Sequence, residues 1–305
     1  MSHTLRAGVI GAGVFGGHHA RQYARLPGVT LAAVLDPHLE RARALAEPLG
    51  GQAFTDLDAF LAAVDVVTVA SPAGFHAGQA LAALAAGKPV YVEKPIAVSL
   101  EEAGAVQAAG RAAGLAVACG HQERVLFKVI GLFGIPEQPL RLEALRHGPP
   151  SERSLDVSVV LDLMVHDLDL ALALSAAEPV TVEGEGSVAA SGTWDTARAE
   201  VAFDDGFTAV FDVSRQASAR RRAMRVVYPS GEVEIDFLTR AFRNTTPHPL
   251  NADFADTPAA QDTLAASIQA FLQAARGEAA APLVGAADGA RALDLALAVE
   301  WALAG

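Results

Sequence analysis

The sequence is poor in cysteine and in long apolar runs, and each absence excludes a class of protein. The single cysteine among 305 residues, Cys119, excludes an intramolecular disulfide and a cysteine-based metal cluster. No apolar run approaches the ~20 residues that a transmembrane helix needs, so we expect no membrane partner. Residues 1–10 lead directly into a strand-like run, which is unlike a secretory signal. These features are typical of a protein of the reducing cytoplasm.

Positive charge is scarce as well. Lys and Arg total 23 against 35 Asp and Glu, a formal net charge of −12. A surface this negative repels nucleic acid unless a local basic patch compensates, so we expect no nucleic-acid partner. One candidate patch consists of five arginines: Arg215, Arg220, Arg221, Arg222 and Arg225. We interpret it as a solvated strand-and-turn edge, with a phosphate-binding site as the alternative.

Residues 1–120 alternate short apolar runs with alanine-rich segments of helical period. The predicted buried strands are Leu5–Ile10, Thr30–Leu35, Val64–Ala70, Val90–Val92 and Leu115–Cys119. The helices predicted between them are Phe15–Leu26, Leu39–Leu49, Asp56–Ala63, Gly74–Ala86 and Leu100–Ala113. Such alternation favours a parallel sheet with helices on both faces, and right-handed crossovers make it doubly wound. We therefore predict an α/β Rossmann domain over residues 1–120.

The pattern changes after residue 120. One apolar helix, 157–175, precedes the predicted strands Val180–Ala189, Ala197–Phe203, Phe207–Ser214, Ala223–Tyr228 and Val233–Phe237. Short turns between consecutive strands are typical of an antiparallel sheet, so residues 121–305 are predicted to form an α+β domain for substrate binding and oligomerisation. A surface loop is expected over 244–258. Helices are expected over 260–276 and 286–304, with the C-terminal helix able to pack back on the Rossmann domain.

The segment Gly11-Ala12-Gly13-Val14-Phe15-Gly16 follows the first predicted strand and opens the first predicted helix. In this setting a G-x-G-x-x-G sequence is typical of dinucleotide binding. Gly11 permits the tight turn, Gly13 lets the backbone approach a pyrophosphate, and Gly16 lets helix and strand pack closely. The free N–H groups at the helix start, where Val14 and Phe15 lie, favour the phosphate charge.

The second predicted strand ends at Asp36, about 20 residues beyond the glycines. A carboxylate there accepts hydrogen bonds from the adenosine ribose and repels a 2′-phosphate, so the predicted cofactor is NAD rather than NADP. The alternative is an aspartate that only caps the following helix. The adjacent His18 and His19 point about 100° apart on a helix, and we interpret them as structural rather than as metal ligands.

Two further motifs accompany the fourth and fifth predicted strands. Ala70-Ser71-Pro72, with His76, follows the fourth, and Gly87-Lys88-Pro89-Val90-Tyr91-Val92-Glu93-Lys94-Pro95 contains the fifth. With the glycine segment, these motifs resemble the glucose-fructose oxidoreductase/inositol dehydrogenase (Gfo/Idh/MocA) family over essentially the whole chain. The resemblance implies an NAD-dependent dehydrogenase of sugar CH–OH groups. It also implies a cofactor site that includes Ser71, Pro72, His76, Glu93 and Lys94.

The resemblance places Lys94 beside the nicotinamide and in contact with the substrate hydroxyl, before a proline that often follows a cis peptide bond. The physical chemistry agrees, because ligands bind at the carboxyl ends of parallel strands. An ammonium there stabilises the charge that develops on oxygen during hydride transfer. Lysine is otherwise scarce, with only Lys88 and Lys128 elsewhere. A surface lysine is the alternative.

The apolar helix of the second domain carries Asp162 and His166, which are four residues apart and share a helix face, with Asp169 one turn further on. In the family this D-x-x-x-H pattern lies beside the lysine, and the histidine is the general base of the inositol dehydrogenases. A histidine suits that role because it titrates near neutrality. The alternative is a core histidine satisfied by backbone. Which of Asp162, Asp167 and Asp169 faces the cleft stays open, and no metal is predicted.

The segments 120–124 and 162–169 resemble the subgroup that oxidises the 3-hydroxyl of UDP-N-acetylglucosamine, ahead of transamination towards amide-linked lipid A. His121 and Arg124 are then predicted to contact the substrate, together with Lys94, Asp162 and His166. Arginine suits the diphosphate. A homodimer or homotetramer is expected. The alternatives are a free-sugar or inositol dehydrogenase, a non-catalytic dinucleotide sensor and, last, an NAD-dependent glycosidase.

Overall fold

The computed structural model describes residues 4–150, 157–175, 177–189 and 192–305. The chain divides into two units, and each is described by itself. The first unit comprises Met1–Val125 and Asp262–Ala290, and the second comprises Leu126–Gln261 and Arg291–Gly305. The sequence-based boundary at residue 120, with a single second domain after it, stays a prediction.

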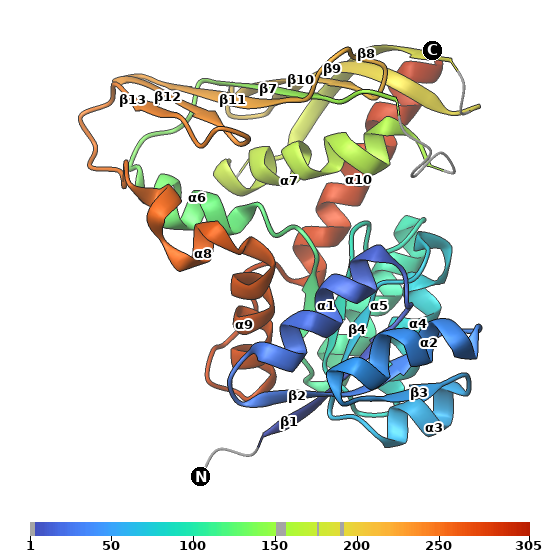
Figure 1. The fold of residues 1–305 in the computed structure, drawn as a ribbon. Helices are drawn as coiled ribbons and strands as arrows, with labels where there is room; N and C mark the ends of the chain where they lie inside the picture. The colour runs from blue at the N-terminus through green and yellow to red at the C-terminus, as the bar shows by residue number, and fades with distance from the viewer. Residues whose placement is uncertain (1–3, 151–156, 176, 190–191) are drawn as a thin grey trace. The chain divides into compact units, whose positions relative to one another are not determined.

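Within the described residues, the first unit contains a six-stranded sheet, called the first sheet, in the order β3-β2-β1-β4-β5-β6. All of its strand pairs are parallel. Its strands are β1 (Leu5–Ile10), β2 (Val29–Leu35), β3 (Gln52–Phe54), β4 (Val66–Val69), β5 (Val90–Val92) and β6 (Val117–Cys119). This is the doubly wound order of a dinucleotide-binding sheet, so the predicted Rossmann fold is confirmed (Figure 1).

The helices of the first unit follow the strands in alternation. They are α1 (Val14–Arg25), α2 (Leu39–Ala46), α3 (Leu57–Ala62), α4 (His76–Ala85), α5 (Leu100–Ala113) and α9 (Thr263–Ala275). One buried cluster joins the sheet to α1, α2 and α9, with Tyr23, Tyr91 and Phe271 among its fully buried side chains. The α9 helix therefore completes the Rossmann core although it lies late in the chain.

In the part of the chain that the structure describes, the second unit contains a seven-stranded sheet, called the second sheet, in the order β13-β12-β11-β7-β10-β9-β8. Its strands are β7 (Arg141–His147), β8 (Pro179–Val188), β9 (Trp194–Phe203), β10 (Thr208–Ser214), β11 (Arg221–Tyr228), β12 (Gly231–Asp236) and β13 (Phe242–Asn244). The β7–β10 pair is parallel and the other pairs are antiparallel. The predicted mostly antiparallel α+β domain is confirmed.

One face of the second sheet is covered by helix and the other is open (Figure 1). The main covering helix is α7 (Val165–Leu174), which continues a π-helical turn, Val160–Met164. The remaining helices are α6 (Arg124–Ile130), α8 (Pro258–Gln261) and α10 (Ala286–Ala304). Leu142, Phe211 and Leu168 belong to the buried cluster between the sheet and the helices. No helix of the described residues is both long and apolar enough to cross a membrane.

Two sequence-based predictions are corrected, and a third needs a qualification. The expected helix 260–276 is broken at Asp262, whose carboxylate caps α9 by accepting the N–H of Ala265 at 2.9 Å. The expected surface loop 244–258 is exposed or half-buried at most positions, as predicted, although Phe254 within it is fully buried. The expected single α-helix 157–175 contains the π-helical turn instead.

Candidate active site

The turn between β1 and α1 has the conformation that its glycines predict. Gly11 has a φ of 100°, which lies in the left-handed region. A Cβ on Gly16 would lie 1.8 Å from the carbonyl oxygen of Gly11, so only glycine permits this close approach. Gly13 has nothing within 4 Å of where its Cβ would be, and Val14 and Phe15 beside it are exposed. The turn therefore has open space at the N-terminus of α1, where a phosphate is favoured.

Asp36 lies directly after β2, and two backbone donors orient its carboxylate. Oδ2 accepts the N–H of Ala12 at 2.9 Å, and Oδ1 accepts the N–H of His38 at 2.9 Å. These bonds tie the carboxylate to the glycine turn. The N-cap residue of α2 is His38 rather than Asp36, so capping that helix does not explain the aspartate. Each oxygen retains capacity to accept a ribose hydroxyl.

Glu93 lies just beyond β5, and its carboxylate is buried against His19 of α1. Oε1 is 2.7 Å from Nε2 of His19, and Oε2 accepts the backbone N–H of Lys94 at 3.3 Å. Burial acts to raise the pKa of Glu93, but the hydrogen bond from His19 and the electrostatic effects of His19, Lys94 and His76 hold it below its ordinary value. A Cβ on Gly120 would lie 2.6 Å from Oε2, so the carboxylate needs the space that this glycine leaves. The charged carboxylate thereby fixes the backbone at Lys94.

His76 begins α4, and its ring joins the two loops that follow β4 and β5. Nδ1 lies 2.7 Å from the carbonyl oxygen of Pro95, and Nε2 lies 2.8 Å from that of Ser71. The Ser71 hydroxyl donates to Gln79 at 2.7 Å. The Lys94–Pro95 peptide bond is cis, as the family resemblance implies. Both ring nitrogens of His76 are thus used within the protein, in the loops of the predicted cofactor site.

His121 and Arg124 lie between β6 and the first turn of α6. Both are buried. Nη1 of Arg124 donates to Oδ1 of Asp288 at 3.0 Å, and the other oxygen of that carboxylate accepts the N–H of Gly285. The guanidinium is therefore fixed in place by a carboxylate. The predicted substrate contacts of His121 and Arg124 stay predictions.

Asp162 and His166 lie where the π-helical turn passes into α7. Both side chains are half-buried. A π-turn contains more residues than an α-turn. Asp162 and His166, four residues apart, are therefore separated by nearly one full turn and still lie on the same face of the helix, as predicted. Short π-helical insertions are frequent at functional sites.

Asp167 and Asp169, in contrast, are buried. Arg146 of β7 donates from Nε and Nη2 to the two oxygens of Asp167 at 2.9 and 2.7 Å. The two side chains of this pair are 3% and 4% exposed. The pair fixes α7 on the second sheet immediately beside His166. Sequence reasoning missed Arg146, because its strand was not predicted.

The five arginines do not form one patch. Arg215 is buried and donates from Nε to Asp195 at 2.7 Å. Arg225 is exposed on the open face of the second sheet and pairs with Glu232. Arg220 and Arg221 are exposed. The exposure of Arg220, Arg221 and Arg225 supports their interpretation as solvated strand and turn residues. The same interpretation is wrong for Arg215, which forms a buried ion pair.

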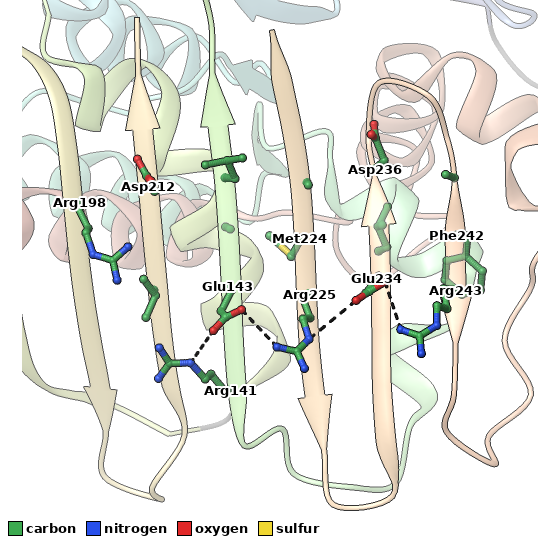
Figure 2. Close-up of a pocket in the computed structure, with 16 residues that line it drawn as sticks. Arg141, Glu143, Arg198, Asp212, Met224, Arg225, Glu234, Asp236, Phe242 and Arg243 are labelled. Atoms are coloured by element: carbon green, nitrogen blue, oxygen red, sulfur yellow. Dashed lines mark hydrogen bonds and ion pairs between the residues drawn. The ribbon is translucent and has the colours of Figure 1, made fainter. Parts of the chain in front are cut away.

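A groove of about 640 Å³ lies on the open face of the second sheet. Figure 2 shows its charged side chains in alternation across neighbouring strands, with Glu143 between Arg141 and Arg225. The apolar residues Leu145, Val210 and Phe242 also line it. None of the predicted cofactor or catalytic residues lines this groove.

The first unit brings together the glycine turn, Asp36 and the loops at Ser71 and Lys94 at the carboxyl ends of the parallel strands, where ligands bind. The second unit carries Asp162 and His166. That these two residues act together with Lys94 stays a prediction.

Comparison with known proteins gives matches to both parts of the chain. Residues 5–121 match an oxidoreductase family with an NAD-binding Rossmann fold, and residues 141–234 match the GFO/IDH/MocA C-terminal domain. The cofactor prediction, NAD, is thereby confirmed. A UDP-N-acetylglucosamine 3-dehydrogenase of Acidithiobacillus ferrooxidans is 38% identical over 281 residues, 88% of either chain.

Two further matches extend the comparison. The solved structure of UDP-N-acetylglucosamine 3-dehydrogenase GnnA from the same organism superposes with a TM-score of 0.92 at 36% identity, covering 99% of this chain and 98% of that one. An NAD-dependent scyllo-inositol 2-dehydrogenase of Bacillus subtilis is 28% identical over 70% of this chain and 68% of its own length.

Proposed function

We propose, on the premise that the chain belongs to the Gfo/Idh/MocA family of oxidoreductases, that it oxidises the 3-hydroxyl of UDP-N-acetylglucosamine with NAD to the 3-keto nucleotide sugar. One observation carries this proposal: the relative with that activity is 38% identical over 88% of both chains. The inositol dehydrogenase relative is more distant, at 28%. Oxidation of an inositol or a free sugar is therefore the second candidate.

The residues of the first unit that would hold NAD fit its groups. The open turn at Gly13 suits the pyrophosphate, and the carboxylate of Asp36 suits the adenosine ribose. Ser71, Pro72 and Glu93 lie in the loops after β4 and β5, on the side where the nicotinamide is expected. When bound, NAD supplies a ring carbon that accepts the hydride from the sugar.

Three side chains act on the substrate in this proposal. His166 takes the proton from the 3-hydroxyl as general base. Lys94 holds the substrate oxygen and stabilises its developing negative charge. Asp162, which shares a helix face with His166, orients the lysine or the substrate. His121 and Arg124 contribute further contacts to the substrate.

The test is turnover of UDP-N-acetylglucosamine with NAD, followed by the absorbance of NADH. A glutamate-dependent aminotransferase that consumes 3-keto sugars should be included, because the ketone equilibrium opposes oxidation. We expect Lys94→Ala to abolish turnover and Lys128→Ala, at an exposed lysine, to retain it. Absence of turnover in a protein that binds NAD would reject this substrate.

The alternatives give different results in the same assay. An inositol or free-sugar dehydrogenase would turn over its own substrate, and UDP would not compete with it. A non-catalytic sensor would bind NADH without turnover of any polyol or nucleotide sugar. The retention of Lys94, Asp162 and His166 argues against the sensor.

The 3-keto product suggests the place of the reaction. A ketone at this position is a substrate for transamination to an amino sugar, which an amide-linked lipid A requires. We therefore place the enzyme in the cytoplasm, ahead of an aminotransferase.

A homo-oligomer formed through the open face of the second sheet completes the proposal. Its alternating charges and the apolar floor of the groove suit a second copy, because a two-fold axis suitably placed on this face would set opposite charges of the two copies against each other. We expect a dimer or tetramer in sedimentation experiments and a shift to monomer in Leu145→Glu. A wild-type protein that stays monomeric at high concentration would reject this interface.

A further inference from the structure

The ring of His76 lies where both of its nitrogens meet backbone carbonyl oxygens. Nδ1 is 2.7 Å from the oxygen of Pro95, and Nε2 is 2.8 Å from the oxygen of Ser71. A carbonyl oxygen accepts hydrogen bonds and does not donate them. Both contacts are therefore hydrogen bonds only when both ring nitrogens carry a proton, and this defines the imidazolium form.

The surroundings decide which form is favoured. A neutral ring would turn a lone pair towards a carbonyl oxygen at hydrogen-bond distance, and His76 is 2% exposed, so water cannot relieve that repulsion. The N-terminus of α4 opposes a cation there. The Glu93 carboxylate favours a cation at His76, because the positive charge of the ring and the negative charge of Glu93 stabilise each other.

The other titratable groups around this carboxylate come from two elements. Lys94 follows it directly in the loop after β5, and its charge also acts on Glu93. His19 reaches the carboxylate from α1 at 2.7 Å. The imidazolium thus belongs to a buried arrangement of charges in which Glu93 is the central anion.

We propose that His76 is a positioning residue that works as an imidazolium: it ties the loop at Ser71 to the loop at Pro95 and thereby holds the backbone of Lys94 in place. The importance of the backbone at Lys94 rests on the proposed function, whereas the protonated bridge itself does not. Loss of the proton at higher pH removes one of the two bonds, so the loops after β4 and β5 separate and the cofactor site loosens.

The first experiment reads the protonation state directly. We expect nitrogen NMR of ¹⁵N-histidine-labelled protein at neutral pH to show one buried histidine with two protonated ring nitrogens. His76→Gln should remove that signal, and His248→Gln, in the second unit, should remove a different one. Scalar connectivity assigns the signal in the wild-type protein should the variant not fold. A neutral ring at His76 would overturn the proposal.

The second experiment measures NAD affinity against pH by protein fluorescence. We expect wild-type affinity to fall as pH rises above neutrality. His76→Gln should bind about tenfold more weakly at neutral pH, since it loses one charge-assisted bond, and its affinity should not change over that range. Parallel pH profiles of the two proteins would overturn the proposal.

Failure of this inference is distinguishable from failure of the proposed substrate. Neither experiment uses a sugar. The imidazolium signature without turnover of UDP-N-acetylglucosamine would therefore reject only the proposed substrate and leave the role of His76 intact. Conversely, turnover by a protein with a neutral His76 rejects only the positioning role. Where a substrate is turned over, His76→Gln should lower kcat more than it raises the KM for the sugar, because Lys94 is displaced rather than removed.

Discussion

Replacing Arg146 with methionine is expected to destabilise the second unit, because it leaves the carboxylate of Asp167 buried without its guanidinium. The two bonds between them, at 2.9 and 2.7 Å, join side chains that are 3% and 4% exposed. Removing one partner of a buried pair costs about 3–5 kcal/mol, whereas an exposed pair contributes about 0–1 kcal/mol. We therefore expect Arg146→Met to lower the free energy of unfolding by about 3–5 kcal/mol.

The assay is urea unfolding of the purified protein, followed by circular dichroism. Arg291→Met is the matched control, because Arg291 and Glu178 form a 2.9 Å pair in the second unit with side chains 40% and 69% exposed. The control should lose about 1 kcal/mol or less. The double variant Arg146→Met with Asp167→Leu should recover a large part of the loss, since the carboxylate that lost this guanidinium is removed as well.

A loss in Arg146→Met no larger than in the control would refute the reasoning, because it would mean that water compensates the carboxylate. Turnover adds a second readout. Asp167 lies in the first turn of α7 and directly follows His166. Its ion pair with Arg146 therefore helps to position His166, and we expect the double variant to lose kcat even where its stability is recovered.

Three further predictions concern the first unit. Gly16→Ala should abolish NAD binding in a fluorescence titration, because its Cβ would lie 1.8 Å from the carbonyl oxygen of Gly11; unchanged binding would mean that the turn is not rigid. Asp36→Ala should reduce the preference for NAD over NADP in kinetic assays, since the carboxylate that repels a 2′-phosphate is lost; an unchanged ratio would contradict this role. The pKa of Glu93 is lowered by the hydrogen bond of His19 despite burial, so its contribution to stability is present above the unfolded-state value of about 4.3 and is lost as pH falls through the folded-state value. Acid unfolding of Glu93→Gln should therefore lack that component.

The parts of the site that are local in sequence were predictable. The glycine turn needs a left-handed residue and two close approaches, and only glycine supplies them, so Gly11 and Gly16 are recognisable from their spacing. Asp36 and Lys94 follow buried strands, and the carboxyl ends of parallel strands meet on one edge of the sheet. Such features depend on backbone conformation over a few residues.

The strands that were missed have weak local signals. β3 spans only Gln52–Phe54 and has no fully buried residue. β7, Arg141–His147, alternates correctly between buried and half-buried positions, but Arg146 occupies one of the buried positions. An alternation rule that expects apolar residues there fails, because it has no knowledge of the aspartate that will neutralise the charge.

The sequence by itself determined the dinucleotide turn, the strand–helix alternation and the residues that end the strands, since each follows from conformational preferences of short segments. Only the tertiary structure decided the partners: Glu93 with His19 across 74 positions, His76 with Pro95 across 19, and Arg146 with Asp167 across 21. A buried charged or hydrogen-bonding group needs a specific partner at hydrogen-bond distance. Which neighbour arrives there depends on strand order and helix packing, and no single segment encodes these.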